Sequence, residues 1–142
     1  MDSLLDFSGQ VALITGAGSG FGRLLSKGLA ERGCKLVISD IDPKGLAETV
    51  EGLSDFADSV IAQHCDVSKE ADCKAMVDSA MDKFGRVDIG VNNAGIAHSM
   101  APMHTIDEAT MDKQMDVNVK GVMFGMKYQI EVMLKQGSGH IL

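Results

Sequence analysis

The sequence predicts an α/β fold in which a doubly wound parallel sheet carries helices on both faces. Three observations predict it: short apolar runs alternate with segments of helical periodicity, the runs are apolar throughout, and the first ends in a glycine-rich turn. Strands that are apolar on both faces are typical of parallel sheets covered on two sides. With 142 residues, of which 45% are hydrophobic and 23% charged, we expect one domain over residues 1–142.

The first two predicted strands are each followed by a helix. The apolar run Val11–Ile14 predicts a strand, and apolar residues recur at helical spacing between residues 21 and 29. A second run, 36–38, is followed by Asp42 and Pro43, which are typical of an N-cap and a first helical position. The helix that they open is predicted to carry Leu46, Val50 and Leu53.

Two further strands are predicted at 60–62 and 87–91. Between them, Ser68 is expected to cap a helix that ends at Gly85. A long helical stretch follows the fourth strand, from about Asp107 to Met133. Residues 140–142 have the pattern of an opening fifth strand. We therefore expect the sheet to be truncated there and the chain to be the N-terminal part of a longer protein.

Charge and cysteine content exclude several classes of function. The formal net charge is −7, from 13 Lys and Arg against 20 Asp and Glu, and no segment clusters basic residues. A nucleic acid or an acidic membrane surface is therefore not an expected partner. Cys34, Cys65 and Cys73 form no C-x-x-C pair and have no histidines at zinc-site spacing. We expect reduced thiols, no metal site and a cytoplasmic protein without a secretory signal or membrane span.

A glycine loop, Thr15-Gly16-Ala17-Gly18-Ser19-Gly20-Phe21-Gly22, joins the first strand to its helix. Glycines let a backbone approach a pyrophosphate closely, and the N-terminus of a helix supplies N–H donors to the anion. The general G-x-G-x-x-G pattern is not met, because Phe21 and Arg23 stand where its last glycine would fall. The pattern T-G-x-x-x-G-x-G is met. A plain strand-to-helix turn is the alternative, and four glycines in seven residues make it the weaker one.

Two more motifs accompany the glycine loop, Asp66-Val67 after the third strand and Asn92-Asn93-Ala94-Gly95 after the fourth. In this order and spacing, the chain resembles the short-chain dehydrogenase/reductase family over its whole length, which implies a Rossmann-type fold. The resemblance implies that the cofactor phosphates lie beside the loop that begins at Gly16, next to Ser19, Gly20, Phe21 and Gly22. It implies that adenine lies beside Asp66 and Val67. It also implies that the adenosine ribose and the centre of the sheet lie beside Asn93, Ala94 and Gly95. Asn118 matches the asparagine of the family's catalytic tetrad. For Asn92 and Asn93 the alternative is a buried amide pair that satisfies backbone groups where the strand ends, and for Asn92 we favour it.

Asp40, at the end of the second strand, follows Gly22 by 18 residues. A carboxylate about 20 residues after such a loop accepts hydrogen bonds from the adenosine ribose, and it also repels a 2′-phosphate. By the same resemblance, Ser19 and Ile41 stand at two positions where NADP-preferring relatives often carry a cation, and both are neutral. These residues indicate NAD as the cofactor. The alternative is that Asp40 caps a helix or faces solvent, and Asp42 competes for the cap.

The family's proton-transfer residues are a serine and a Tyr-x-x-x-Lys pair. The single tyrosine, Tyr128, is followed four residues on by Val132, so this pair is not in the sequence. We expect it beyond Leu142, and we expect the 142 residues alone to be inactive. The resemblance implies an NAD-dependent oxidoreductase for a secondary alcohol or ketone, assembled as a dimer or tetramer through its long helix. The alternative is a non-catalytic dinucleotide-binding or regulatory module, and a purely structural protein is disfavoured.

Overall fold

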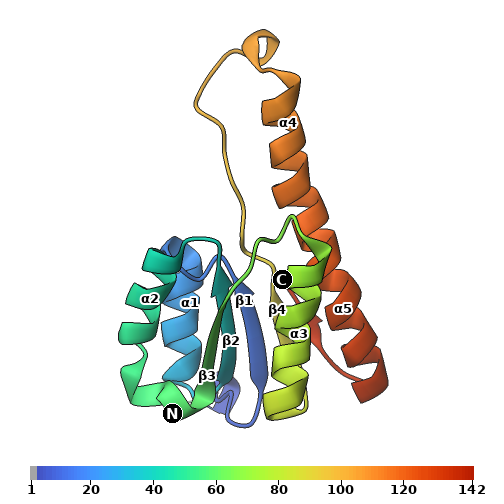
Figure 1. Ribbon diagram of the computed structural model, residues 1–142. Coiled ribbons are helices and arrows are strands. Elements are labelled where there is room, and N and C mark those ends of the chain that lie inside the picture. The colour runs from blue at the N-terminus through green and yellow to red at the C-terminus, as the bar shows by residue number, and fades with distance from the viewer. Residues whose placement is uncertain (1–2) are drawn as a thin grey trace.

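The computed structural model describes residues 3–142, so the first two residues of the predicted domain lie outside it. One sheet of five parallel strands has the order β3-β2-β1-β4-β5 (Figure 1). Leu13, at the centre of the sheet, pairs with Val37 on one side and with Gly90 on the other. The strands are β1 Val11–Thr15, β2 Lys35–Asp40, β3 Val60–His64, β4 Ile89–Val91 and β5 His140–Ile141. The predicted parallel α/β fold is confirmed.

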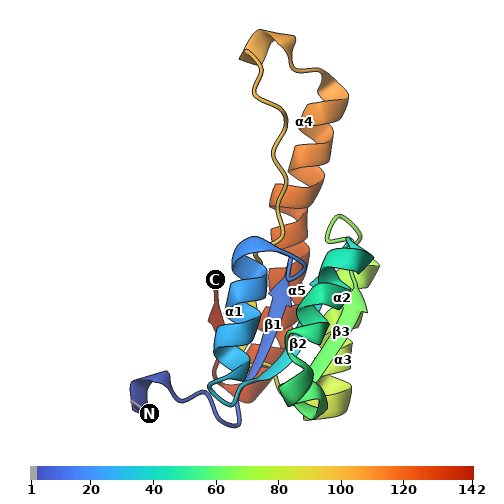
Figure 2. The same ribbon diagram turned by 90° about the vertical axis from the view of Figure 1, so that its left-hand side faces the viewer.

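Helices cover both faces of the sheet, α1 and α2 on one side and α3 and α5 on the other (Figures 1 and 2). Alternate side chains of each strand point to opposite faces, and β1 follows this rule. Ala12 and Ile14 pack in the core beneath α1 and α2, whereas Val11 and Leu13 pack in the core beneath α3 and α5. The helices are α1 Gly20–Ala30, α2 Pro43–Glu51, α3 Glu70–Phe84, α4 Glu108–Met115 and α5 Gly121–Gln136.

The predicted cap of α2 is confirmed, and the predicted cap of α3 is wrong. Asp42 accepts a hydrogen bond from the Lys44 N–H, with Pro43 at the first helical position. Ser68 does not cap α3, which begins only at Glu70. Its N–H and its hydroxyl both donate to the Asp66 carboxylate, at 3.0 and 2.6 Å, because a carboxylate is a stronger acceptor than a neutral group.

The end of one helix and the continuity of another also differ from the predictions. Leu53 is buried in the core but lies beyond α2, which ends before Gly52, a residue that disfavours helix. The stretch predicted as one helix from Asp107 is helical to Gln136 but contains a π-helical segment, Asp116–Lys120, between α4 and α5.

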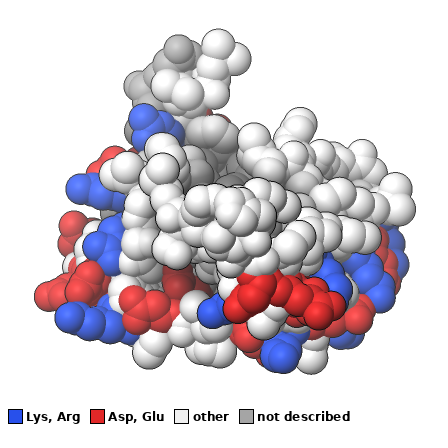
Figure 3. Space-filling model, turned by 90° about the horizontal axis from the view of Figure 1, so that it is seen from above, with Lys and Arg blue, Asp and Glu red and all other residues white. Residues whose placement is uncertain are grey.

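An arm projects beyond the carboxyl ends of the strands (Figures 1 and 2). It consists of residues 96–107, with a short 3₁₀ turn at Met103–Thr105, and of α4. Seen from this end, most of the face is uncharged, and charged side chains gather along its rim (Figure 3). Four methionines on the arm are exposed: Met100, Met103, Met111 and Met115. Within residues 3–142, none of the helices combines the length and the apolar character that a membrane crossing requires.

Candidate functional site

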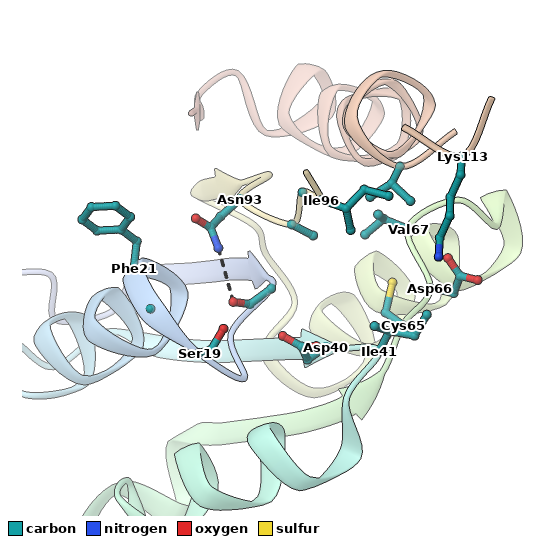
Figure 4. A pocket seen from close by; sticks show the side chains of 15 residues that line it. Ser19, Phe21, Asp40, Ile41, Cys65, Asp66, Val67, Asn93, Ile96 and Lys113 are labelled. Atoms are coloured by element: carbon teal, nitrogen blue, oxygen red, sulfur yellow. Dashed lines mark hydrogen bonds between the residues drawn. The ribbon is translucent and has the colours of Figure 1, made fainter. Parts of the chain in front are cut away.

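The carboxyl ends of β1 and β4 are joined by hydrogen bonds beside the glycine loop. The Asn93 Nδ2 group donates to the carbonyl oxygen of Thr15 at 3.0 Å. It also donates to the carbonyl oxygen of Gly16 at 3.3 Å (Figure 4). The Ala94 N–H donates to Thr15 Oγ1 at 3.0 Å. In a doubly wound sheet the crevice at the point where strand order reverses is the usual ligand site, and here that point lies between β1 and β4.

A pocket of about 380 Å³ opens at this crevice, and we call it the switch-point pocket. The predicted cofactor residues that line it are Gly16, Ser19, Gly20, Phe21, Asp40, Ile41, Asp66, Val67, Asn93, Ala94 and Gly95. Of the predicted cofactor residues, Gly22 alone is not in its lining. Four lining residues were not predicted: Cys65, Ile96, Lys113 and Val117. The structure therefore brings together residues that lie far apart in the sequence.

The loop between β1 and α1 leaves the start of the helix accessible to an anion. Ser19 stands at the N-cap in an extended conformation, and its side chain makes no capping hydrogen bond. Gly20 has φ of +49°, and a Cβ built there would meet no atom within 4 Å. The N–H groups of a first helical turn have no intrahelical partners and carry the positive end of the helix dipole. This end of the pocket therefore suits a phosphate group.

Gly22 serves the packing of α1 rather than the pocket wall. A Cβ at Gly22 would overlap the carbonyl oxygen of Gly16. Gly16 itself has φ of +66°, and its Cβ would lie 2.9 Å from both Ala94 Cα and Asn93 Nδ2. The two glycines therefore let α1, the loop and the end of β4 approach each other closely, as glycines do in dinucleotide-binding loops.

Asp40 is held at the end of β2 by two backbone N–H groups. Its Oδ2 accepts from Gly18 N at 2.8 Å and its Oδ1 accepts from Asp42 N at 2.9 Å. Each carboxylate oxygen can accept two hydrogen bonds, so both retain a free lone pair for a diol. The alternative that Asp40 caps α2 is wrong, because Asp42 occupies the cap.

The other end of the pocket, away from Phe21, contains Asp66 and Lys113 (Figure 4). Val67 and Cys65 are buried beside them. Lys113 comes from α4 and Val117 from the π-helical segment, so the arm forms one wall. Cys65 could have been predicted as a lining residue, because it directly precedes Asp66, a predicted cofactor residue. The helical pattern contains no signal that predicts Lys113 or Val117 as lining residues.

Asn118 lies in the π-helical segment and holds the loop that follows Gly95. Its Oδ1 accepts from Ile96 N and its Nδ2 donates to Ile96 O, both at 2.8 Å. It does not line the switch-point pocket, whereas Ile96 does. π-Helical insertions are frequent at functional sites. The geometry thus makes Asn118 a positioning residue for the pocket wall.

Two other polar residues have structural partners. Asn92 exchanges two hydrogen bonds of 3.0 Å with the buried side chain of Gln129, so the prediction that Asn92 satisfies backbone groups is wrong. The Tyr128 hydroxyl donates to Glu70 Oε1 at 2.8 Å. That hydrogen bond, burial and the charge of Glu70 raise the pKa of Tyr128, which opposes its use as a base.

Comparison with known proteins identifies the family. The family described as short chain dehydrogenase matches residues 10–142, and the chain belongs to it. An uncharacterized oxidoreductase of Thermotoga maritima is 43% identical over 141 residues, covering 97% of this chain and 54% of the relative. Levodione reductase of Leifsonia aquatica is 36% identical over 138 residues, covering 96% of this chain and 52% of the relative.

Solved structures agree with this assignment. A short-chain dehydrogenase/reductase from Burkholderia phymatum in complex with NAD superimposes with a TM-score of 0.90 at 39% identity, covering 96% of this chain and 48% of that one. A 3-ketoacyl-(acyl-carrier-protein) reductase from Brucella melitensis complexed with NADH gives a TM-score of 0.86 at 41% identity, covering 93% and 53%. The chain spans about half the length of the relatives that it matches.

Proposed function

We propose that this chain is part of a cytoplasmic, NAD-dependent oxidoreductase, an enzyme that interconverts a secondary alcohol and a ketone. The observation that carries the proposal is the switch-point pocket, where an open helix N-terminus, the Asp40 carboxylate and the Asp66-Val67 turn line one crevice. Two of the similar solved structures contain NAD or NADH, which supports this choice of cofactor.

The residues of the pocket fit the parts of a dinucleotide. The first turn of α1 binds the pyrophosphate, and Asp40 accepts hydrogen bonds from the adenosine ribose through its free lone pairs. The Asp66-Val67 turn and Ile96, which line the same pocket, would hold the adenine. Bound NAD supplies a hydride acceptor or, when reduced, a hydride donor.

Proton transfer requires a group that these 142 residues do not supply. Asn118 orients the Ile96 wall, and an amide is not a general base. Tyr128 is tied to Glu70 and has no lysine four residues on. We therefore propose that a serine and a Tyr-x-x-x-Lys pair lie in a further part of the protein, and that residues 1–142 bind NAD without turnover.

We also propose assembly into a dimer or tetramer through α5. Its outer face exposes a row of large apolar side chains, namely Met123, Met126, Ile130 and Leu134. Exposed apolar surface of this kind is typical of an interface between protein chains. Sedimentation velocity measures the oligomeric state directly, and a monomer at all concentrations contradicts the proposal.

Titration of NAD and NADP tests the cofactor assignment. We expect NAD to bind at least about tenfold more tightly than NADP, since a hydrogen bond to a charged group contributes about 1.5–3 kcal/mol. Asp40→Asn keeps an acceptor for the Gly18 N–H but removes the charge, and we expect it to weaken NAD binding and improve NADP binding.

Asp42→Asn is the matched control, because it removes a charge two residues away while asparagine can still cap α2. It should leave the preference unchanged. Equal affinities in the unaltered protein, or an equal response of both variants, contradict the assigned role of Asp40. A complete protein that binds NAD but oxidises no secondary alcohol in a broad panel favours the non-catalytic alternative.

A further inference from the structure

The glycine loop after β1 rests against the first turns of α2. Gly45 of α2 lies so close to the loop that a Cβ there would stand 2.6 Å from the carbonyl oxygen of Gly18. Glycine is among the least favourable residues inside a helix, but a larger residue at this position would collide with the loop. Thr49 follows four residues later in α2 and is 3% exposed. The loop and α2 are therefore in direct contact.

Two side chains hold the peptide between Ala17 and Gly18. The Thr49 Oγ1 atom lies 2.8 Å from the Ala17 carbonyl oxygen and 3.1 Å from that of Gly45. A hydroxyl has one proton to donate, and Ala17 is the nearer acceptor. The Gly18 N–H donates to Asp40 Oδ2 at 2.8 Å. Rotation of this peptide therefore breaks a hydrogen bond at both of its polar atoms.

The next peptide, between Gly18 and Ser19, is held through Arg23. The Arg23 Nη2 group donates to the Gly18 carbonyl oxygen, and Arg23 Nε donates to Thr49 Oγ1 at 2.9 Å. In a planar trans peptide the C=O and the N–H that follows it point in opposite directions. The Ser19 N–H therefore points away from the guanidinium, and Ser19 lines the switch-point pocket (Figure 4). Among residues 3–142, none accepts a hydrogen bond from it.

We propose that Thr49 is a positioning residue for the pyrophosphate of the cofactor, and this inference rests on the proposed function. The Thr49 hydroxyl accepts from Arg23 and donates to Ala17, so one side chain fixes two successive peptides of the loop. Thr49 does not line the pocket and acts only through these neighbours. The orientation that it fixes leaves the Ser19 N–H free for the anion before the cofactor binds. Donors that are already in place bind a ligand more tightly than donors that binding must order.

Ser26 provides an internal comparison on α1. It is fully buried, and its Oγ donates to the Gly22 carbonyl oxygen, four residues earlier in the same helix, at 2.7 Å. Like the hydroxyl of Thr49, this hydroxyl forms a buried hydrogen bond to a backbone carbonyl group. Unlike Thr49, it does not contact the peptides that follow Ala17 and Gly18. Loss of the Ser26 hydroxyl therefore removes a similar hydrogen bond without releasing these two peptides.

The test compares Thr49→Ala with Thr49→Ser in the full-length protein, because these variants differ only in the hydroxyl oxygen. Calorimetric titration measures NAD affinity at a temperature at which thermal unfolding shows each variant to be folded. We expect Thr49→Ala to weaken NAD binding by about tenfold, since the loop loses both a donor and an acceptor. Thr49→Ser should stay within about twofold of the unaltered protein, because it keeps both hydrogen bonds. Ser26→Ala should leave the affinity unchanged.

A second measurement separates positioning from a general loss of stability. The amide resonance of Ser19, followed by NMR in isotope-labelled protein, reports a hydrogen bond donated by this N–H. We expect saturating NAD to shift the resonance downfield in the unaltered protein and in Thr49→Ser. The shift should be smaller in Thr49→Ala, because its Gly18–Ser19 peptide is no longer held. Lower stability alone does not change the shift in a folded and saturated protein.

Two results with the variants overturn the proposal. One is a folded Thr49→Ala variant that binds NAD as tightly as the unaltered protein. The other is an equal loss of affinity in Thr49→Ala and Thr49→Ser, which assigns the effect to the missing methyl group.

If Thr49→Ala does not fold, the unaltered protein still decides. A downfield shift of the Ser19 resonance with NAD supports the proposal, and a resonance that saturating NAD leaves unshifted overturns it. Unaltered protein that fails to bind NAD contradicts the proposed function. Unaltered protein that binds NAD, with an affinity that does not depend on the Thr49 hydroxyl, contradicts only the role of Thr49.

Discussion

At the start of α1, Gly20 has φ of +49°, and at the end of α3, Gly85 has φ of +73°; a Cβ at either position meets no atom within 4 Å. Alanine at either site costs about 1–2 kcal/mol of stability, because the left-handed region strains an L-residue. We expect Gly20→Ala also to weaken NAD binding by at least about tenfold, since its methyl group occupies space that the pyrophosphate needs.

Gly85→Ala is the matched control, because it carries similar strain far from the pocket. Urea unfolding and NAD titration of both variants separate the two effects. If Gly20→Ala binds NAD as tightly as Gly85→Ala does, the pyrophosphate does not lie against Gly20.

The sequence predicted those pocket residues whose side-chain chemistry and distance from the glycine loop suit one part of the cofactor. Asp40 was found because a carboxylate at that offset suits a ribose, and the structure places it in the pocket. Lys113 was missed because its place depends on how α4 crosses the pocket, which no local pattern encodes. Gly22 was assigned to the phosphates by its motif, but its close neighbour in the structure is the Gly16 carbonyl.

Between α1 and α2, Arg23 joins the glycine loop to the helix that follows β2. Its Nη2 donates to the carbonyl oxygens of Gly18 and, at 3.1 Å, of Gly45, and pairs with Glu48 at 3.0 Å. Its Nε donates to Thr49 Oγ1 at 2.9 Å. One planar guanidinium thus serves four partners, which a flexible ammonium cannot do. The geometry of the loop therefore depends on this side chain.

We expect Arg23→Met to lower the free energy of unfolding by about 1–3 kcal/mol, because two carbonyl groups lose a charged donor. NAD affinity should fall as well, since Gly18 also donates to Asp40. Thermal unfolding and NAD titration measure both. Lys27→Met, which removes an exposed pair with Glu31 at 4.0 Å on the same helix, should change neither. Normal NAD binding by Arg23→Met means that the loop holds its shape without the arginine.

Apolar spacing predicted the existence of the helices better than their interruptions. The π-helical segment was not predicted, because helical spacing continues through it and the cause lies elsewhere in the chain. Asn118 is fixed by Ile96, 22 residues earlier, and that contact is tertiary. The boundary of α3 was misplaced for a local reason, since Asp66 competes for the Ser68 hydroxyl.

At the amino-terminal end of the sheet, Asp88 links three strands. Its Oδ2 accepts from Val11 N at 2.9 Å and from Arg86 Nε at 2.8 Å. Its backbone carbonyl accepts from His140 N at 2.8 Å. Burial acts to raise the pKa of Asp88, but the hydrogen bonds from Arg86 and Val11 outweigh it and hold the pKa below its ordinary value.

A depressed pKa in the folded state contributes stability above the unfolded value, about 3.9, and that contribution is lost as pH falls through the folded value. We expect Asp88→Asn to reduce stability by about 1–2 kcal/mol at neutral pH. The variant should also lose less stability than the unaltered protein between about pH 5 and pH 2. Urea unfolding across this range measures both effects.

Asp78→Asn is the control, because Asp78 forms only an exposed pair with Lys74 along α3. It should leave the acid dependence unchanged. An acid dependence in Asp88→Asn as steep as that of the unaltered protein assigns the acid sensitivity to other carboxylates.

The overall architecture followed from alternation of element types, because a strand that is apolar on both faces requires helices on both sides. The link that Asp88 makes between strands could not be predicted from this alternation. It joins residues 77 positions apart in the chain, and the sequence around Asp88 contains no signal for its partner.

The strand order also determines when each pair of strands can form during translation. β1, β2 and β3 are neighbours in both sequence and space, so they can associate as they leave the ribosome. The far edge of β1 pairs with β4, and Val91 is synthesised 51 residues after Asp40. At ordinary translation rates this delay is roughly 3–10 s. During this delay the glycine loop that follows β1 is complete, but β4, which borders the crevice on its other side, has not yet been made. If the proposed function holds, a nascent chain can therefore bind NAD only once the segment through Gly95 has emerged.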